Sequence, residues 1–76
     1  MVSTNISTEK ITILVNGEPL ICLKNLSLVS LLNYLDLDFR QNVIEYNSEI
    51  IKKDNLSSII VQNNDVIEIV TIVGGG

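Results

Sequence analysis

The chain has 76 residues, a net charge of −4, one cysteine and no histidine. This length fits one small domain and excludes a two-domain enzyme, because a second hydrophobic core needs a longer chain. The excess of carboxylates repels phosphate backbones and anionic lipid heads, so we expect neither a nucleic-acid nor a membrane partner. With no histidine and only Cys22, one chain cannot build a zinc site, a Ser-His-Asp or Cys-His catalytic pair, or an internal disulfide.

Residues 1–9 are rich in serine, threonine and asparagine and show no sustained hydrophobic period. We expect them to form a flexible N-terminal extension, and they lack the charged and apolar regions of a signal peptide. The domain is expected to begin at Lys10, where the apolar runs ITILV and LICLK flank Asn16-Gly17-Glu18-Pro19. Asn-Gly tolerates positive φ at both positions, so this stretch predicts a β-hairpin, with Pro19 at the exit of the turn or at the start of an edge strand.

A single amphipathic helix is predicted after Ser27, whose hydroxyl suits the N-cap position. The leucines that follow stand at positions i, i+3, i+4 and i+7, which places them on one face of a helix. These residues are Leu28, Leu31, Leu32 and Leu35. We expect the helix to continue to about Asp36.

The second half of the chain predicts three more strands. Residues 43–46 and 49–51 have the composition of short strands around an Asn47-Ser48 turn, and Asp54 is expected to cap a single helical turn after them. The run VIEIVTIV over residues 66–73 predicts the strongest strand in the chain.

This order of elements predicts an α+β domain. One real helix covers only one face of a sheet, which favours a β-grasp (ubiquitin-like) fold, a mixed sheet wrapped around one helix. A ferredoxin-like fold would need a second full-length helix, for which residues 53–60 are too few. We therefore expect a β-grasp domain over residues 10–73 and a flexible glycine tail over residues 74–76.

The last predicted strand runs directly into Gly74, Gly75 and Gly76. Glycines have no Cβ to pack and lose much backbone freedom on ordering, so they do not stabilise a fold. An extended tail from Val73 reaches about 13 Å and passes through a channel that side chains would block. This geometry suits a C-terminal carboxylate that enters a partner's active site, and the alternative is a frayed end or a cloning remnant.

Alternation along the last strand places Glu68 on the same face as Val66, Val70 and Ile72. If Glu68 faces water, the apolar residues on its face do so too. Exposed Val70 and Ile72 close to the tail, together with Val73, then form a candidate docking surface for a partner. The alternative is that they are ordinary scattered surface residues.

The motifs VNGEPL, LVSLLNYL, VIEYNSEII, NNDVIEIV and the final IVGGG, in this order, resemble the ThiS family of sulfur carriers of thiamine biosynthesis. The resemblance covers residues 11–76. Where such carriers often have NGE in the centre and a DGD-like turn before the last strand, this chain has Asn47-Ser48-Glu49 and Asn63-Asn64-Asp65. Both changes keep turn-forming residues, so the expected fold is the same.

The resemblance implies a protein that is a co-substrate of its partners and not an enzyme. A ThiF-like adenylating enzyme would use ATP and magnesium to form an acyl-adenylate on Gly76, and a persulfide from a cysteine desulfurase relay would convert it to a thiocarboxylate. Gly74 and Gly75 would enter the partner's active site, and the sulfur would pass to the thiazole synthase ThiG. The carrier would bind no cofactor, would be a monomer when free, and would lie in the cytoplasm, or in the plastid stroma if plastid-encoded.

Three other functions remain open. They are a sister sulfur carrier for molybdopterin synthesis or tRNA thiolation, a ubiquitin-like modifier joined to lysines through Gly76, and a β-grasp interaction module with an inert tail. Cys22 is interpreted as a packing residue or a half-exposed thiol, not as a relay. Asp36, Asp38 and Asp54 lack the pattern of an oxygen-ligand loop and predict no cation site.

Overall fold

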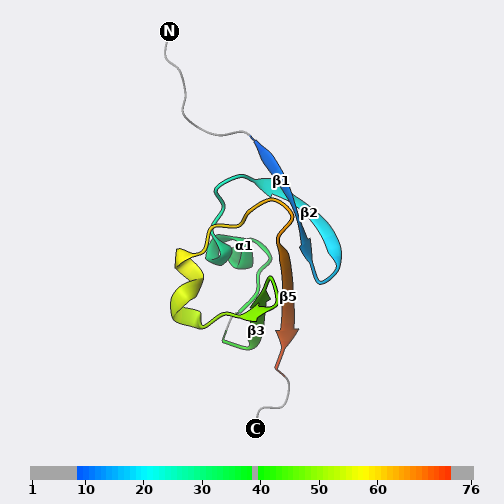
Figure 1. Ribbon diagram of the computed structural model, residues 1–76. Coiled ribbons are helices and arrows are strands. Elements are labelled where there is room, and N and C mark those ends of the chain that lie inside the picture. The colour runs from blue at the N-terminus through cyan, green and yellow to red at the C-terminus, as the bar shows by residue number, and fades with distance from the viewer. Residues whose placement is uncertain (1–8, 39, 73–76) are drawn as a thin grey trace.

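The computed structural model describes residues 9–38 and 40–72. Most of the predicted N-terminal extension, Val73 at the end of the predicted domain, and the predicted tail lie outside these residues. In the described part, five strands form one mixed sheet with the order β2-β1-β5-β3-β4. Figure 1 shows α1 beside this sheet, with β5 next to the β1–β2 hairpin. No helix among the described residues has the length and apolar composition to cross a membrane.

The predicted N-terminal hairpin is confirmed. It consists of β1 (Lys10–Val15) and β2 (Glu18–Leu23), paired antiparallel. Asn16 and Gly17 have φ values of 51° and 83°, the left-handed values that a two-residue turn of type I′ requires. Pro19 lies in β2, which is an edge strand of the sheet, so its missing N–H removes no bond from the interior of the sheet.

The second hairpin and the last strand complete the sheet. Strands β3 (Asn42–Tyr46) and β4 (Glu49–Ile50) flank Asn47 and Ser48, which both have positive φ. Strand β5 (Val66–Thr71) pairs parallel with β1 and antiparallel with β3, so it lies at the centre of the sheet. The last strand therefore joins the two hairpins.

The helix α1 (Leu28–Tyr34) begins as predicted, because Ser27 adopts an extended backbone and its hydroxyl accepts a hydrogen bond from the Ser30 N–H at 3.1 Å. It ends earlier than predicted. Asp36 has a φ of 58°, and the N–H groups of Asp36 and Leu37 donate to the carbonyls of Asn33 and Leu32. This is the Schellman arrangement, with an aspartate where glycine is usual, and it terminates the helix at Tyr34.

The 3₁₀ helix η1 (Lys53–Ser58) corrects one sequence-based prediction. Asp54 is not its cap: the N-cap residue is Lys52, which makes no side-chain capping bond, and Asp54 lies in the first turn. Burial of Leu56 fixes this segment against the core, so packing and not capping decides where it begins.

The core lies between the sheet and α1. Alternate residues of β1, β3 and β5 point inward and meet one face of the helix, together with two residues from the segment that follows β4. The fully or almost fully buried members are Ile11, Ile13, Leu28, Leu31, Leu32, Ile44, Leu56, Val61 and Ile67. A mixed sheet that wraps one helix is the predicted β-grasp architecture.

Candidate functional site

The end of β5 and Ile72 come directly before residues 73–76 in the chain. Thr71 pairs with Asn42 of β3, and the N–H of Ile72 donates to the carbonyl of Gln41 at 2.8 Å. The hydroxyl of Thr71 also donates to the side-chain oxygen of Asn42 at 2.9 Å. The last described residues are therefore anchored to the loop between α1 and β3, and the position where the tail begins is fixed relative to the sheet.

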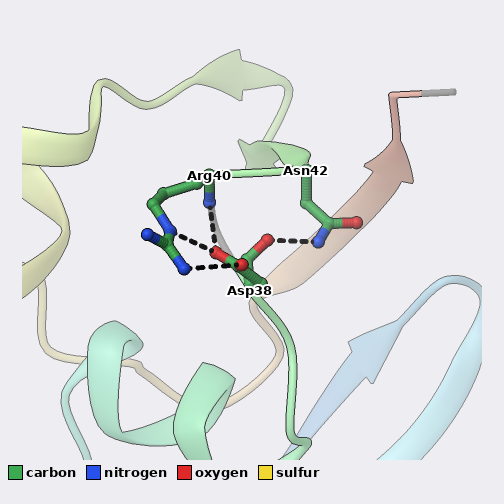
Figure 2. Close-up of polar contacts among 3 residues, drawn as sticks. All are labelled: Asp38, Arg40 and Asn42. Atoms are coloured by element: carbon green, nitrogen blue, oxygen red, sulfur yellow. Dashed lines mark hydrogen bonds and ion pairs between the residues drawn. The ribbon is translucent and has the colours of Figure 1, made fainter. Parts of the chain in front are cut away.

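That loop is held in shape by a local network (Figure 2). The Asp38 carboxylate accepts bonds from the Arg40 backbone N–H at 2.9 Å and from its guanidinium at 3.1 and 3.2 Å. The side-chain amide of Asn42 donates to the Asp38 carbonyl. These bonds from Arg40 hold the pKa of Asp38 below its ordinary value. The ion pair between Arg40 and Asp38 is exposed and therefore contributes little to the free energy of unfolding. Its effect is to fix the conformation of the loop that precedes Gln41 and Asn42, which bond Ile72 and Thr71.

The beginning of β5 is fixed by Asp65, which is 8% exposed. Its carboxylate accepts hydrogen bonds from the Tyr46 hydroxyl, from the Asn47 side-chain amide at 3.1 Å and from the Gln62 N–H at 2.7 Å. Burial, and then the bond to the Asp65 carboxylate and its charge, raise the pKa of Tyr46 to about 12. The group is therefore a structural anchor in which each carboxylate oxygen is satisfied.

Two turn asparagines hold β5 from either side. The backbone N–H of Asn16 donates to the Ile67 carbonyl, and the side-chain oxygen of Asn16 accepts a hydrogen bond from the Ile69 N–H at 2.7 Å. In a regular parallel ladder, a backbone carbonyl would accept that second bond. On the other side, the Asn47 side-chain oxygen accepts from the Val66 N–H at 2.8 Å. From the sequence, both residues are predicted only as turn formers. The available signal was the choice of asparagine, which adopts positive φ and also offers a side-chain amide.

The outer face of β5 has the predicted alternation. Val70 and Ile72 are 59% and 53% exposed, while Ile67 on the opposite face is fully buried. Glu68 lies half-buried on the outer face, directly opposite Glu45 of β3, and its Oε2 atom is inaccessible and has no hydrogen-bond partner among the described residues. The exposure of Val70 and Ile72 is thus observed. Their role in docking, with that of Val73, stays a prediction, as do the roles of Gly74, Gly75 and Gly76.

Cys22 lies half-buried on β2, opposite Ile11, and lines an apolar pocket of about 280 Å³ between β2 and α1. Burial raises the pKa of its thiol. Its packing against the core agrees with the interpretation as a packing residue. Among the described residues, no three His, Cys, Asp or Glu side chains gather in a way that would hold a metal ion.

Comparison with known proteins identifies the family. The model of the ThiS family matches residues 13–76. The chain belongs to the ThiS family. The crystal structure of the thiamine biosynthesis protein ThiS from Geobacter metallireducens superimposes with a TM-score of 0.77 at 25% identity, covering 87% of this chain and all of that one. This similarity confirms the β-grasp fold.

Relatives of similar length occur in other organisms. The ycf40 protein of Trieres chinensis is 48% identical over 73 residues, which cover 96% of this chain and 99% of that protein. The ycf40 protein of Porphyra purpurea is 43% identical over the full length of both chains. The thiazole synthase of Paramagnetospirillum magneticum is 33% identical over 64 residues, which are 84% of this chain but 20% of that enzyme. A segment similar to this chain therefore also occurs within a much longer protein.

Proposed function

We propose that this ThiS-family chain is a sulfur carrier whose Gly76 carboxylate becomes a thiocarboxylate and donates sulfur for the thiazole ring of thiamine. The observation that carries the proposal is the anchored end of β5, where Ile72 is bonded to Gln41 immediately before the glycine tail. A fixed starting point and a tail without side chains suit a carboxylate that must reach into a narrow active site. Gly74 and Gly75 would occupy the channel of the partner.

The chemistry needs a partner because an ionised carboxylate is a poor acyl donor. In the first proposed step, the Gly76 carboxylate attacks the α-phosphate of ATP, pyrophosphate leaves, and an acyl-adenylate forms on a ThiF-like enzyme that holds magnesium. In the second, the terminal sulfur of a cysteine persulfide displaces AMP, and a thiol reductant then cleaves the resulting S–S bond to release the thiocarboxylate. The carrier acts as a co-substrate, and the partners supply the catalytic groups.

The proposed sulfur acceptor is a thiazole synthase of the ThiG type. The similarity of this chain to a segment of the Paramagnetospirillum magneticum thiazole synthase supports this choice. The exposed Val70 and Ile72, with Val73, are proposed to dock against these partners, because exposed apolar side chains beside the tail gain most from burial. The name ycf40 follows the convention for plastid reading frames, which supports the plastid stroma as the compartment.

The test is the intact mass of the purified chain after incubation with ATP, magnesium, a ThiF-type adenylating enzyme, a persulfide donor and a thiol reductant. We expect a mass gain equal to the exchange of one oxygen for one sulfur. A chain lacking Gly76 is the matched control and should gain nothing. Isopeptide conjugates in place of a thiocarboxylate would favour a ubiquitin-like modifier. No adenylate with an active enzyme would exclude the thiamine pathway, and the partners of the sister carriers would be tried next.

A further inference from the structure

A second surface feature lies beside Ile72, the last described residue. An open pocket of about 470 Å³ is formed by the end of β5, the beginning of β3 and the segment from β4 to η1. Ile72, the last described residue before the predicted tail, is part of its wall. Val43 and Ile50 supply further apolar wall, and Ile50 is 68% exposed.

The charge of this pocket is opposite to that of the chain as a whole. Arg40, Lys52 and Lys53 line it, which are three of the five basic residues, whereas Asp54 is the only one of the nine acidic residues among its lining. Clustering of cations in an acidic protein is a local arrangement that the net charge does not reveal.

The two lysines are available for a partner. Neither Lys52 nor Lys53 forms an ion pair within 4 Å among the described residues, and both side chains are exposed. Arg40 is engaged by Asp38, which orients its guanidinium at the rim. The pocket therefore presents two exposed ammonium groups next to exposed apolar side chains, and the carboxylate on which the charge of Lys53 acts, that of Asp38, already bonds Arg40.

We propose that this pocket binds an acidic segment of the protein that receives the tail. Carboxylates of the segment would meet Lys52 and Lys53, and an apolar side chain of it would rest against Ile50 and Ile72. Opposite charge at the rim of an interface accelerates association and fixes orientation, and burial of the apolar wall adds affinity. The inference rests on the proposed function in one respect, that a partner takes the tail. Beyond that function, the inference names the surface that the partner contacts and the acidic and apolar groups that the partner would supply.

The test uses two double variants with the same change in net charge. Lys52→Glu/Lys53→Glu reverses the charge of the pocket. Lys10→Glu/Lys24→Glu reverses two lysines at the start of β1 and just after β2, at the end of the sheet opposite to the end of β5 (Figure 1). Glutamate at the start of η1 is compatible with a helix N-terminus, so the first variant is expected to fold. Circular dichroism of both variants checks this.

The measurement is the rate of association with the ThiF-type adenylating enzyme, without ATP, at low and high salt. We expect the pocket variant to associate about tenfold more slowly at low salt and to lose most of its salt dependence. The distal variant should stay close to wild type. Lys52→Arg/Lys53→Arg should restore the rate, and Ile50→Ser should speed dissociation.

The outcomes separate this inference from the proposed function. If the wild-type chain acquires sulfur but the pocket variant associates like wild type, the inference is wrong and the carrier function stands. If the pocket variant alone is slow but no chain acquires sulfur, the pocket is a docking site and the carrier function is wrong. Equal slowing of both double variants, or no binding by the wild-type chain, would overturn the inference.

Discussion

Asp65 and Tyr46 form a buried polar contact at the start of the central strand. A buried carboxylate is tolerated only when its oxygens are bonded, and here three donors from different segments meet it. The position of β5 thus depends on a few polar atoms as well as on apolar packing. Burial and the bond to Asp65 raise the pKa of the Tyr46 phenol.

This group predicts a loss of stability at high pH. The folded-state pKa of Tyr46 is about 12 against an ordinary value of 10, so the folded chain keeps the phenol proton where the unfolded chain has lost it. The contribution is complete below about pH 10 and is lost as the pH rises towards about 12. Urea denaturation across this range should show the free energy of unfolding falling.

Two tyrosine variants isolate the effect. Tyr46→Phe should remove this part of the pH dependence, whereas Tyr34→Phe should retain it, because Tyr34 is 77% exposed. A fall of the same size in Tyr46→Phe would show that other groups cause it. Absorbance of the phenolate, followed in each variant, assigns the titration to one residue.

At the scale of elements, the turns serve the last strand. Asn16 and Asn47 each lie in the turn of a hairpin, and the side chain of each also bonds the backbone of β5. These bonds link the β1–β2 and β3–β4 hairpins to the central strand. Gln41, in the loop after α1, and Asn42, the first residue of β3, bond Ile72 and Thr71 at the other end of β5. The strand that leads to the tail is thus supported along its length by segments between elements.

Replacement of Asn47 tests this role. Asn47→Ala loses two side-chain hydrogen bonds. It also places alanine, which tolerates positive φ less well than asparagine, at a φ of 50°. We expect the free energy of unfolding to fall by about 1–3 kcal/mol. Asn47→Gly keeps the backbone conformation and loses only the bonds. Urea denaturation of both variants separates the two contributions. Full stability of the glycine variant would mean that the bonds to Asp65 and Val66 contribute nothing.

The sequence predicts those elements whose signals are local. Asn16-Gly17 specifies its turn by backbone preference, and Ser27 with the leucine spacing specifies α1, so both are confirmed almost to the residue. Asp54 misled the prediction because burial of Leu56, a tertiary effect, sets the start of η1. The strand order, the asparagine bonds to β5 and the basic pocket join residues far apart in the chain, and no local pattern contains them.

At the scale of the whole molecule, one short helix supplies three of the nine buried apolar residues of the core among the described residues. Leu32 is fully buried, and we expect Leu32→Ala to cost about 2–5 kcal/mol through lost burial and the cavity it leaves. Small domains have a total stability of about 5–15 kcal/mol, so this variant should melt far below wild type. Asn33→Ala, on the exposed side of the same helix, is the control and should melt within a few degrees of wild type. Thermal denaturation followed by circular dichroism measures both, and equal melting temperatures would show that α1 is not essential to the core.

The central position of β5 also determines when the protein can fold during synthesis. The hairpins β1–β2 and β3–β4 form from neighbouring residues, but the second neighbour of β1 is β5, where Leu14 pairs with Val66. The ribosome makes that strand after every other described element, and long-range parallel pairing is slow. Until β5 emerges, the hairpins are unjoined and Ile13 and Ile44 lack their neighbour Ile67. The segment that leads to the glycine tail is therefore the one whose arrival completes the domain, so an incompletely made chain would present neither a folded sheet nor a tail.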